Sequence, residues 1–193
     1  AIAAAQSVKY YHHISQKALL SLNEAIDAFM DKNAEVEPKI HALEEEVIRM
    51  SRKLTDFNVK VVSAGVSEEE NARLSRMALD LADIIRLTEV ADNLTGYTRH
   101  EVNEQLNFSP VIYDQIREMK RLLNAQFANA ETLVDHPSAA TLKEAQTLEG
   151  AIDNQRTTMI QGHMERLTKG ECSPNNSDVF INLTGNLERC GDH

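Results

Sequence analysis

The sequence contains no tryptophan, and aromatic residues make up only 5% of its 193 residues. Turn-forming residues are also scarce, because the chain has only 7 glycines and 4 prolines. Sandwiches and barrels need aromatic and β-branched residues in their strands and frequent turns between them. The shortage of aromatic and turn-forming residues therefore favours packed helices over a β-sheet fold.

Positive charge is in deficit, since 20 Lys and Arg residues stand against 30 Asp and Glu residues, which gives a formal net charge of -10. A protein that binds nucleic acid neutralises phosphates with a basic face. No basic cluster occurs in this sequence. We therefore expect no nucleic-acid partner.

Cysteines and long apolar runs are also lacking. The only two cysteines, Cys172 and Cys190, form neither a disulfide framework nor a metal-type pair, so we expect a reduced, cytoplasmic compartment. No run of about 18 apolar residues occurs, so no segment is predicted to span a bilayer. The chain begins without Met, and Leu187–His193 carries no signal that stops a helix, so we expect a truncated C-terminus.

Apolar residues recur every three or four positions along the chain, which predicts α-helices. Proline is tolerated in the first turn of a helix, and glycine is favoured just after its end. Ser67 and Glu70 also form the pattern of a capping box. The six predicted helices begin near Val8, Pro38, Ser67, Pro110, Pro137 and Pro174, and four of them end at Asn33, Gly65, Asn107 and Gly170.

The two halves of the chain resemble each other. Residues 43–47 are similar to residues 148–152, and Asp92 corresponds to Asp192 near the end of a long apolar stripe. Two copies of a three-helix unit explain this similarity. We therefore predict an all-α fold of six antiparallel helices in two tandem three-helix bundles, residues 1–108 and 109–193.

Two carboxylate pairs lie in the second half. Glu149 with Asp153, and Glu188 with Asp192, are spaced i and i+4, which places each pair on one helix face about 5–6 Å apart. Carboxylate oxygens suit iron, manganese or magnesium. The alternative interpretation is a solvated acidic helix surface. A ferritin-type di-iron bundle is excluded, because no histidine follows a glutamate by three residues.

Catalytic patterns are missing from the sequence. It contains no glycine-rich phosphate loop, no Ser/His/Asp arrangement and no Cys/His cluster. A cysteine nucleophile also needs a base within reach, and the sequence identifies none. We therefore expect a protein that is not an enzyme and has no organic cofactor.

Three segments resemble the PhoU family of phosphate-uptake regulators. Residues 187–193 (LERCGDH) resemble the family signature Leu-Glu-Arg-Ile-Gly-Asp, with Cys190 in place of the aliphatic residue. Residues 163–174 resemble a helix junction in PhoU-like domains at the C-terminus of bacterial sodium/phosphate cotransporters. Residues 40–44 are similar to the second-helix pattern, with His41 in place of an acid.

The resemblance implies metal clusters on surface Glu/Asp-x-x-x-Asp motifs. Carried over to this chain, it assigns the ligands Glu149, Asp153, Glu188 and Asp192 to the second repeat and Asp92 to the first. In the first repeat Thr88 stands where an acid is expected, and Glu44 is a lone acid beside His41. We therefore expect the first site to be weak or empty.

The resemblance also implies a function. We expect a cytoplasmic regulatory domain of a sodium-dependent phosphate cotransporter, located at the inner membrane, whose partner is the transmembrane domain of the same chain. The alternatives are a free-standing PhoU-type regulator of a phosphate importer and its sensor kinase, or a plain helical scaffold. A homodimer through exposed apolar stripes is a further expectation.

Overall fold

The computed structural model describes residues 2–136, 138–170 and 174–192 of the chain. Six α-helices, one short 3-10 helix and no strand occur in these residues. The predicted all-α class is therefore confirmed. The elements are α1 (Ile2–Asp31), η1 (Ala34–Val36), α2 (Glu37–Ser63), α3 (Glu68–Asn103), α4 (Pro110–Asp135), α5 (Ala139–Thr168) and α6 (Pro174–Asp192).

Local sequence signals set most of the helix ends. The Ser67 hydroxyl accepts a hydrogen bond from the Glu70 N–H at 3.1 Å, which satisfies one of the unpaired donors at the start of α3. Ser138 and Thr141 form a reciprocal capping box at the start of α5. Gly65 and Gly170 follow α2 and α5 with φ of 100° and 73°, dihedrals that glycine adopts without strain.

Two predicted helix ends differ from the structure. α1 ends at Asp31, and Lys32 rather than Asn33 takes the left-handed conformation, with φ 54°. The Asn33 N–H then donates to the Ala28 carbonyl at 2.8 Å, and this backbone bond closes the helix. α3 ends at Asn103 instead of Asn107, because Gln105 turns the chain with φ 53°.

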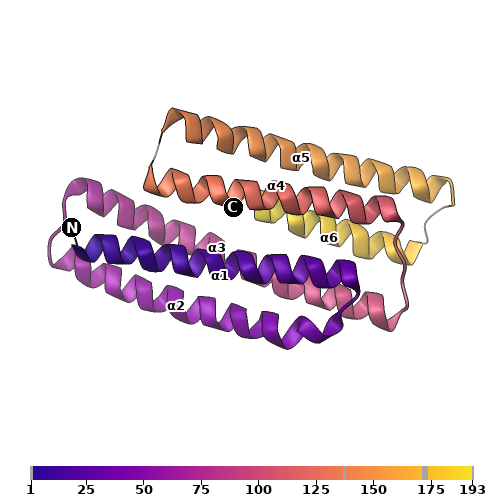
Figure 1. Cartoon of the computed structure of the whole chain (residues 1–193), viewed down its shortest axis with the longest axis horizontal. Coiled ribbons are helices and arrows are strands. Elements are labelled where there is room, and N and C mark those ends of the chain that lie inside the picture. The colour runs from indigo at the N-terminus through magenta and orange to yellow at the C-terminus, as the bar shows by residue number, and fades with distance from the viewer. Residues whose placement is uncertain (1, 137, 171–173, 193) are drawn as a thin grey trace.

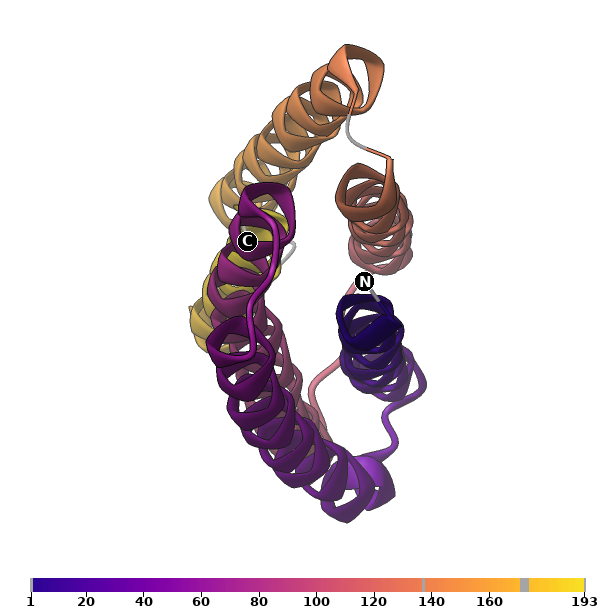
Figure 2. The same cartoon turned by 90° about the vertical axis from the view of Figure 1, so that its left-hand side faces the viewer.

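The six helices form two three-helix units that lie side by side (Figure 1). α1, α2 and α3 pack on one another, as do α4, α5 and α6. The units meet where α1 contacts α4 and where α3 contacts α6. The end-on view shows α1 and α4 one above the other on the same side of the molecule (Figure 2). The predicted boundary between residues 108 and 109 falls in the connection between α3 and α4.

The hydrophobic core has two parts. The larger cluster contains buried residues of all six helices, such as Phe29, Leu94, Ile116, Ile152 and Phe180, so it joins the two units. The smaller cluster lies between α1, α2 and α3 only, and includes Ile14, Val47, Leu54 and Met77. The first unit therefore contributes to both core clusters. The third helix of each unit differs in length, because α3 has 36 residues and α6 has 19.

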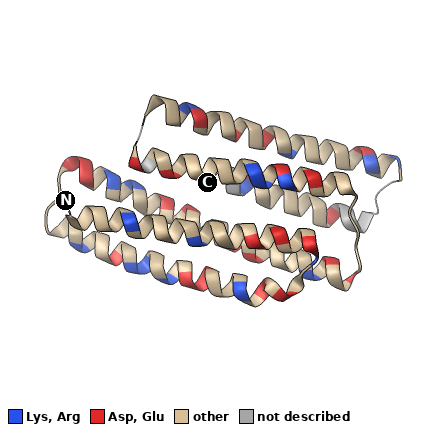
Figure 3. Cartoon of the chain, viewed as in Figure 1, with Lys and Arg blue, Asp and Glu red and all other residues tan. Residues whose placement is uncertain are grey.

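Charged residues of both signs are interspersed along the helices in Figure 3. Among the described residues, no helix is both long enough and apolar enough to cross a membrane.

Candidate functional site

A group of three potential metal ligands lies where α2 and α3 pack together. His41 and Glu44 come from α2 and Asp92 from α3, and one ligand atom from each lies within 4.8 Å of the other two. We call this trio the α2–α3 ligand group. His41 Nδ1 is 3.7 Å from Asp92 Oδ2, and His41 Nε2 is 3.3 Å from Glu45 Oε1.

The helix period explains why these polar residues meet. On α2, Ile40 and Val47 are fully buried, and on α3, Ala91 and Leu94 are fully buried beside Asp92. His41 and Glu44 are three residues apart and therefore share the face at the edge of this apolar contact. Asp92 is half-buried on the facing helix. The packing of apolar neighbours thus holds three ligands from two helices at one seam.

The electrostatics of the group favour a cation. Partial burial raises the pKa of Glu44, and the negative charge of Asp92 raises it further. His41 opposes this increase, while Glu89 and Glu45 add to it. Carboxylates held this close repel one another unless a proton or a cation lies between them.

The donor set fits a transition metal better than magnesium. One imidazole nitrogen with two carboxylate oxygens suits iron or manganese, whereas magnesium prefers oxygen ligands alone. At bond lengths of about 2.0–2.2 Å, two donors on one ion lie at most roughly 4.4 Å apart. The ligand atoms of the group lie within 4.8 Å of one another, so they would move closer together to bind one ion.

The second-repeat ligands are arranged differently. Glu149 and Asp153 are exposed on α5, and Glu149 faces a groove described below. Glu188 on α6 lies 3.5 Å from Arg156 Nε, so a basic side chain is next to its carboxylate. Cys172 and the side chains of Cys190 and Asp192 lie outside the part of the chain that the structure describes. The predicted second-repeat site therefore stays a prediction.

Among the described residues, the α2–α3 ligand group is the only set of three or more His, Cys, Asp and Glu side chains close enough to share a metal ion. It includes the predicted ligand Asp92. Sequence reasoning left His41 and Glu44 out of the predicted ligands, because the first repeat lacks the paired acid at Thr88. The sequence signal that could have identified His41 and Glu44 as ligands was their i, i+3 spacing next to the apolar residue Ile40.

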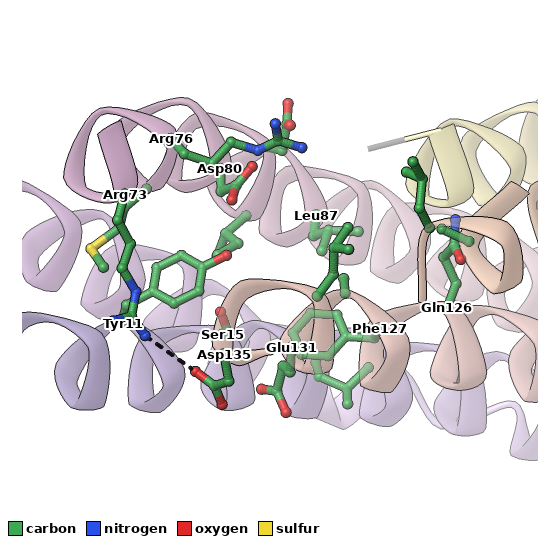
Figure 4. Close-up of a pocket in the computed structure, with 18 of the residues that line it drawn as sticks. Tyr11, Ser15, Arg73, Arg76, Asp80, Leu87, Gln126, Phe127, Glu131 and Asp135 are labelled. Carbon is green, nitrogen blue, oxygen red and sulfur yellow. Dashed lines mark ion pairs between the residues drawn. The ribbon is translucent and has the colours of Figure 1, made fainter. Parts of the chain in front are cut away.

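A cavity of about 670 Å³ lies elsewhere, between α1, α3, α4 and α5. Figure 4 shows Tyr11, Asp80, Phe127 and Glu131 around it, with Arg73 paired to Asp135 at 3.9 Å. Burial raises the pKa of Asp80, while the charge of Arg76 opposes this increase. We call this cavity the α3–α5 groove.

A buried carboxylate lies at the end of α3. Glu101 is fully buried, and neither of its carboxylate oxygens has a hydrogen-bond partner among the described residues. Burial raises the pKa of Glu101 to about 7, and the charge of Lys32 opposes this increase. The negative charge of Glu101 in turn adds to the raised pKa of Tyr113 on α4. Glu101 therefore faces Lys32, which directly follows α1, and Tyr113 of α4, at the connection between the two units.

Comparison with solved structures identifies the fold. The chain superimposes on the crystal structure of PhoU from Pseudomonas aeruginosa with a TM-score of 0.86, and the match covers 99% of this chain and 91% of that one. The chain has the fold of PhoU. The sequence identity is 16%, so this likeness to PhoU concerns the fold. No protein-family model matches the sequence, and no curated protein matches it.

The observed fold agrees with the resemblance of the three sequence segments to the PhoU family. The predicted arrangement of six helices is the one observed, and the superposition on PhoU extends over both three-helix units.

Proposed function

We infer that this chain is a regulatory domain that modulates phosphate uptake. The observation that carries this proposal is the match to PhoU over 99% of the chain. The family-like motifs at residues 40–44, 163–174 and 187–193 support it independently of the fold. In the leading form, the domain acts on the transmembrane part of a sodium-dependent phosphate cotransporter at the cytoplasmic face of the inner membrane.

The proposed role is regulatory, through helix-mediated contacts with the transport protein, and no catalytic residue is assigned. Long antiparallel helices present large continuous surfaces, which suits contact with a partner. The partner in the leading form is the transporter domain of the same chain. In the alternative, a free-standing regulator contacts a phosphate importer and its sensor kinase.

Uptake of radiolabelled phosphate in the source organism tests the proposed function. When the coding segment for this chain is deleted, we expect phosphate uptake to lose its response to added phosphate, because the regulator is missing. Sulfate uptake in the same cells is the control and should not change. An unaltered phosphate response in the deleted strain would contradict the proposal.

The parent reading frame separates the two forms. Several hydrophobic spans encoded upstream of Ala1 support the cotransporter. A start codon just before Ala1 supports the free-standing regulator.

The α2–α3 ligand group is the proposed metal site of this regulator. Bound there, iron or manganese would join α2 to α3 and neutralise the repulsion between Glu44 and Asp92. His41 would supply the nitrogen ligand. A metal at this seam would tie the packing of the first unit to the occupancy of the site, and that coupling gives the domain a means of regulation.

Measurement of the metal content of protein purified without chelator tests the metal site. We expect iron or manganese in the wild type, and Asp92→Asn should weaken metal affinity by at least about tenfold because it removes a charged ligand. Asp56→Asn, on an exposed position of α2, is the matched control and should retain the metal.

Two patterns of metal content would overturn the assignment. Metal loss in Glu188→Gln and Asp153→Asn, but not in Asp92→Asn, places the site in the second repeat. Wild-type protein that carries no metal removes the metal site altogether and leaves the uptake proposal to its own test.

A further inference from the structure

Three ionisable side chains from the two units meet where α1 packs on α4. His12 comes from α1 in the first unit, and Glu131 and Asp135 come from α4 in the second. His12 Nε2 lies 2.7 Å from Asp135 Oδ1, and His12 Nδ1 lies 3.9 Å from Glu131 Oε1. One imidazole ring therefore lies between two carboxylates that are about one turn apart on α4. We call these three residues the α1–α4 cluster.

The register of the two helices explains why the ring reaches α4. Asn23 of α1 and Asn124 of α4 exchange two side-chain hydrogen bonds, at 2.9 and 2.8 Å. His12 lies 11 residues before Asn23, and Asp135 lies 11 residues after Asn124. Eleven residues are about three helical turns, so both pairs lie on the same antiparallel contact. The α1–α4 cluster is thus part of the regular contact between the two units.

Two buried atoms of the cluster lack a hydrogen-bond partner among the described residues. They are His12 Nδ1 and Glu131 Oε1, the two atoms that lie 3.9 Å apart. A neutral imidazole whose Nε2–H donates to Asp135 leaves Nδ1 as an acceptor, and a carboxylate oxygen is also an acceptor. Buried polar atoms without a partner are costly. One proton placed between Nδ1 and Oε1 satisfies both atoms at once.

The electrostatics of the cluster favour a proton at this position. Burial raises the pKa of Glu131, the charge of His12 opposes this increase, and the charge of Asp135 adds to it. Asp135 has a second cation nearby, because Arg73 Nη2 of α3 lies 3.9 Å from its Oδ1 atom (Figure 4). Among the described residues, Glu131 forms an ion pair with His12 alone. The charge of Glu131 therefore depends on His12.

The other ionisable groups near the ring do not pair with Glu131. Lys9 and His13 of α1 are exposed and line a shallow pocket together with His12. On α3, Asp80 interacts with Tyr11, the residue that precedes His12. The groups that act directly on the imidazole are thus the two carboxylates of α4.

We propose that His12 and Glu131 share a proton that ties the two units together at this end of the α1–α4 contact, and that its release to the solvent at higher pH loosens the contact. With the proton bound, Nε2–H donates to Asp135 and a hydrogen bond closes between Nδ1 and Glu131 Oε1. Without it, Nδ1 and the Glu131 carboxylate are both acceptors, and α1 keeps only the bond to Asp135.

The contact is therefore strongest at low pH and weakens as the pH rises. Histidine side chains change charge between pH 5 and pH 8, which places the response in the physiological range. This proton-dependent contact goes beyond the proposed function, because it concerns the two units themselves, whatever the domain regulates.

Amide hydrogen exchange of the purified chain tests the proposal, with mass spectrometry at pH 5.5 and pH 8 and correction for the intrinsic exchange rate. Residues 84–98 in the middle of α3 report changes of the whole fold and serve as the internal reference. Relative to them, protection of residues 2–16 and 128–135 should fall by about tenfold from pH 5.5 to pH 8, because a hydrogen bond between ionisable groups is lost.

Two variants of Glu131 separate the bound and released states. In Glu131→Gln, the side-chain amide donates to His12 Nδ1 without a shared proton, so protection should stay high at both pH values. In Glu131→Ala the acceptor is missing, so protection should be low at both. His13→Gln changes the exposed neighbour of His12 and is the matched control, which should behave like the wild type.

Three results would overturn the proposal. The first is a wild type whose protection at this end does not change with pH relative to the reference. The second is a Glu131→Gln variant that keeps the wild-type change, which would leave the pairing of His12 with Asp135 as its cause. The third is loss of the change in His13→Gln, which would assign the response to His13.

Discussion

Glu101 is held at the end of α3 with its whole side chain buried and its carboxylate oxygens unpartnered among the described residues. Burial disfavours the charged form of a carboxyl group, so the folded protein keeps a proton on Glu101 at a pH where the unfolded chain has released it. The charge of Lys32 favours the ionised form of Glu101, but burial outweighs it. A single residue thus makes the connection between the two units sensitive to pH.

Stability should fall as the pH rises from about 4.5 to about 7, because in this range the folded state binds more protons than the unfolded state. The loss attributable to Glu101 is at most roughly 3 kcal/mol. Glu101→Gln mimics the protonated side chain, so it should remove this decrease and unfold at higher urea concentration than the wild type at pH 8. At pH 4.5 the two proteins should unfold alike.

The exposed neighbour Glu104 provides the control for this measurement. Glu104→Gln should keep the wild-type dependence of the urea midpoint on pH. If Glu101→Gln also keeps it, the buried carboxyl is not the responsible group.

At the scale of the elements, caps and turns set the helix ends, and packing sets their partners. α3 begins after the Ser67 cap and buries residues at helical spacing along its length. It packs against α1 and α2 of its own unit and against α6 of the other unit. The one hydrogen bond from the Glu70 N–H to the Ser67 hydroxyl fixes where this 36-residue helix starts. The same helix carries Asp92 and Glu101.

Ser67→Ala should destabilise the protein by about 1 kcal/mol, because the Glu70 N–H loses its acceptor at the helix start. The measurement is urea unfolding followed by circular dichroism at 222 nm. Ser75→Ala, on an exposed position inside α3, tests the same chemical change without a cap and should be neutral or slightly stabilising. Equal destabilisation by both variants would show that the Ser67 cap contributes nothing specific.

At the scale of the whole molecule, the two units are less separate than two tandem bundles suggest. The larger core cluster includes Phe29 and Leu94 of the first unit together with Ile116 and Phe180 of the second. Burying this shared surface favours the side-by-side arrangement, because neither unit alone covers it. The division into two repeats, residues 1–108 and 109–193, stays a prediction, and the larger core cluster joins the two parts.

The contacts between the two units also determine how a change in the first unit can affect the second. A change at the α2–α3 ligand group acts on α3, which contacts α6 in the second unit. α3 is thus the element through which an event in the first unit reaches the second.

How much of this protein follows from sequence alone differs by feature. The start of α3 at Ser67, the turns at Gly65 and Gly170 and the all-α class were predictable, because they depend on residues within one or two turns of each other. The end of α1 was predicted at Asn33, two residues after Asp31, because the sequence gives no sign that Lys32 takes a positive φ. The same kind of turn at Gln105 ended α3 earlier than predicted.

The sequence by itself determined where helices form, since hydrophobic period and caps are local properties of the chain. Only the tertiary structure decided that His41 and Glu44 face Asp92, and that Glu101 is sealed from water. These features depend on the rotation and register of one helix against another, and the packing of residues far apart in the chain sets both. For the same reason, the sequence pattern pointed to the acidic pairs of the second repeat, whose site stays a prediction, and missed the meeting of His41, Glu44 and Asp92.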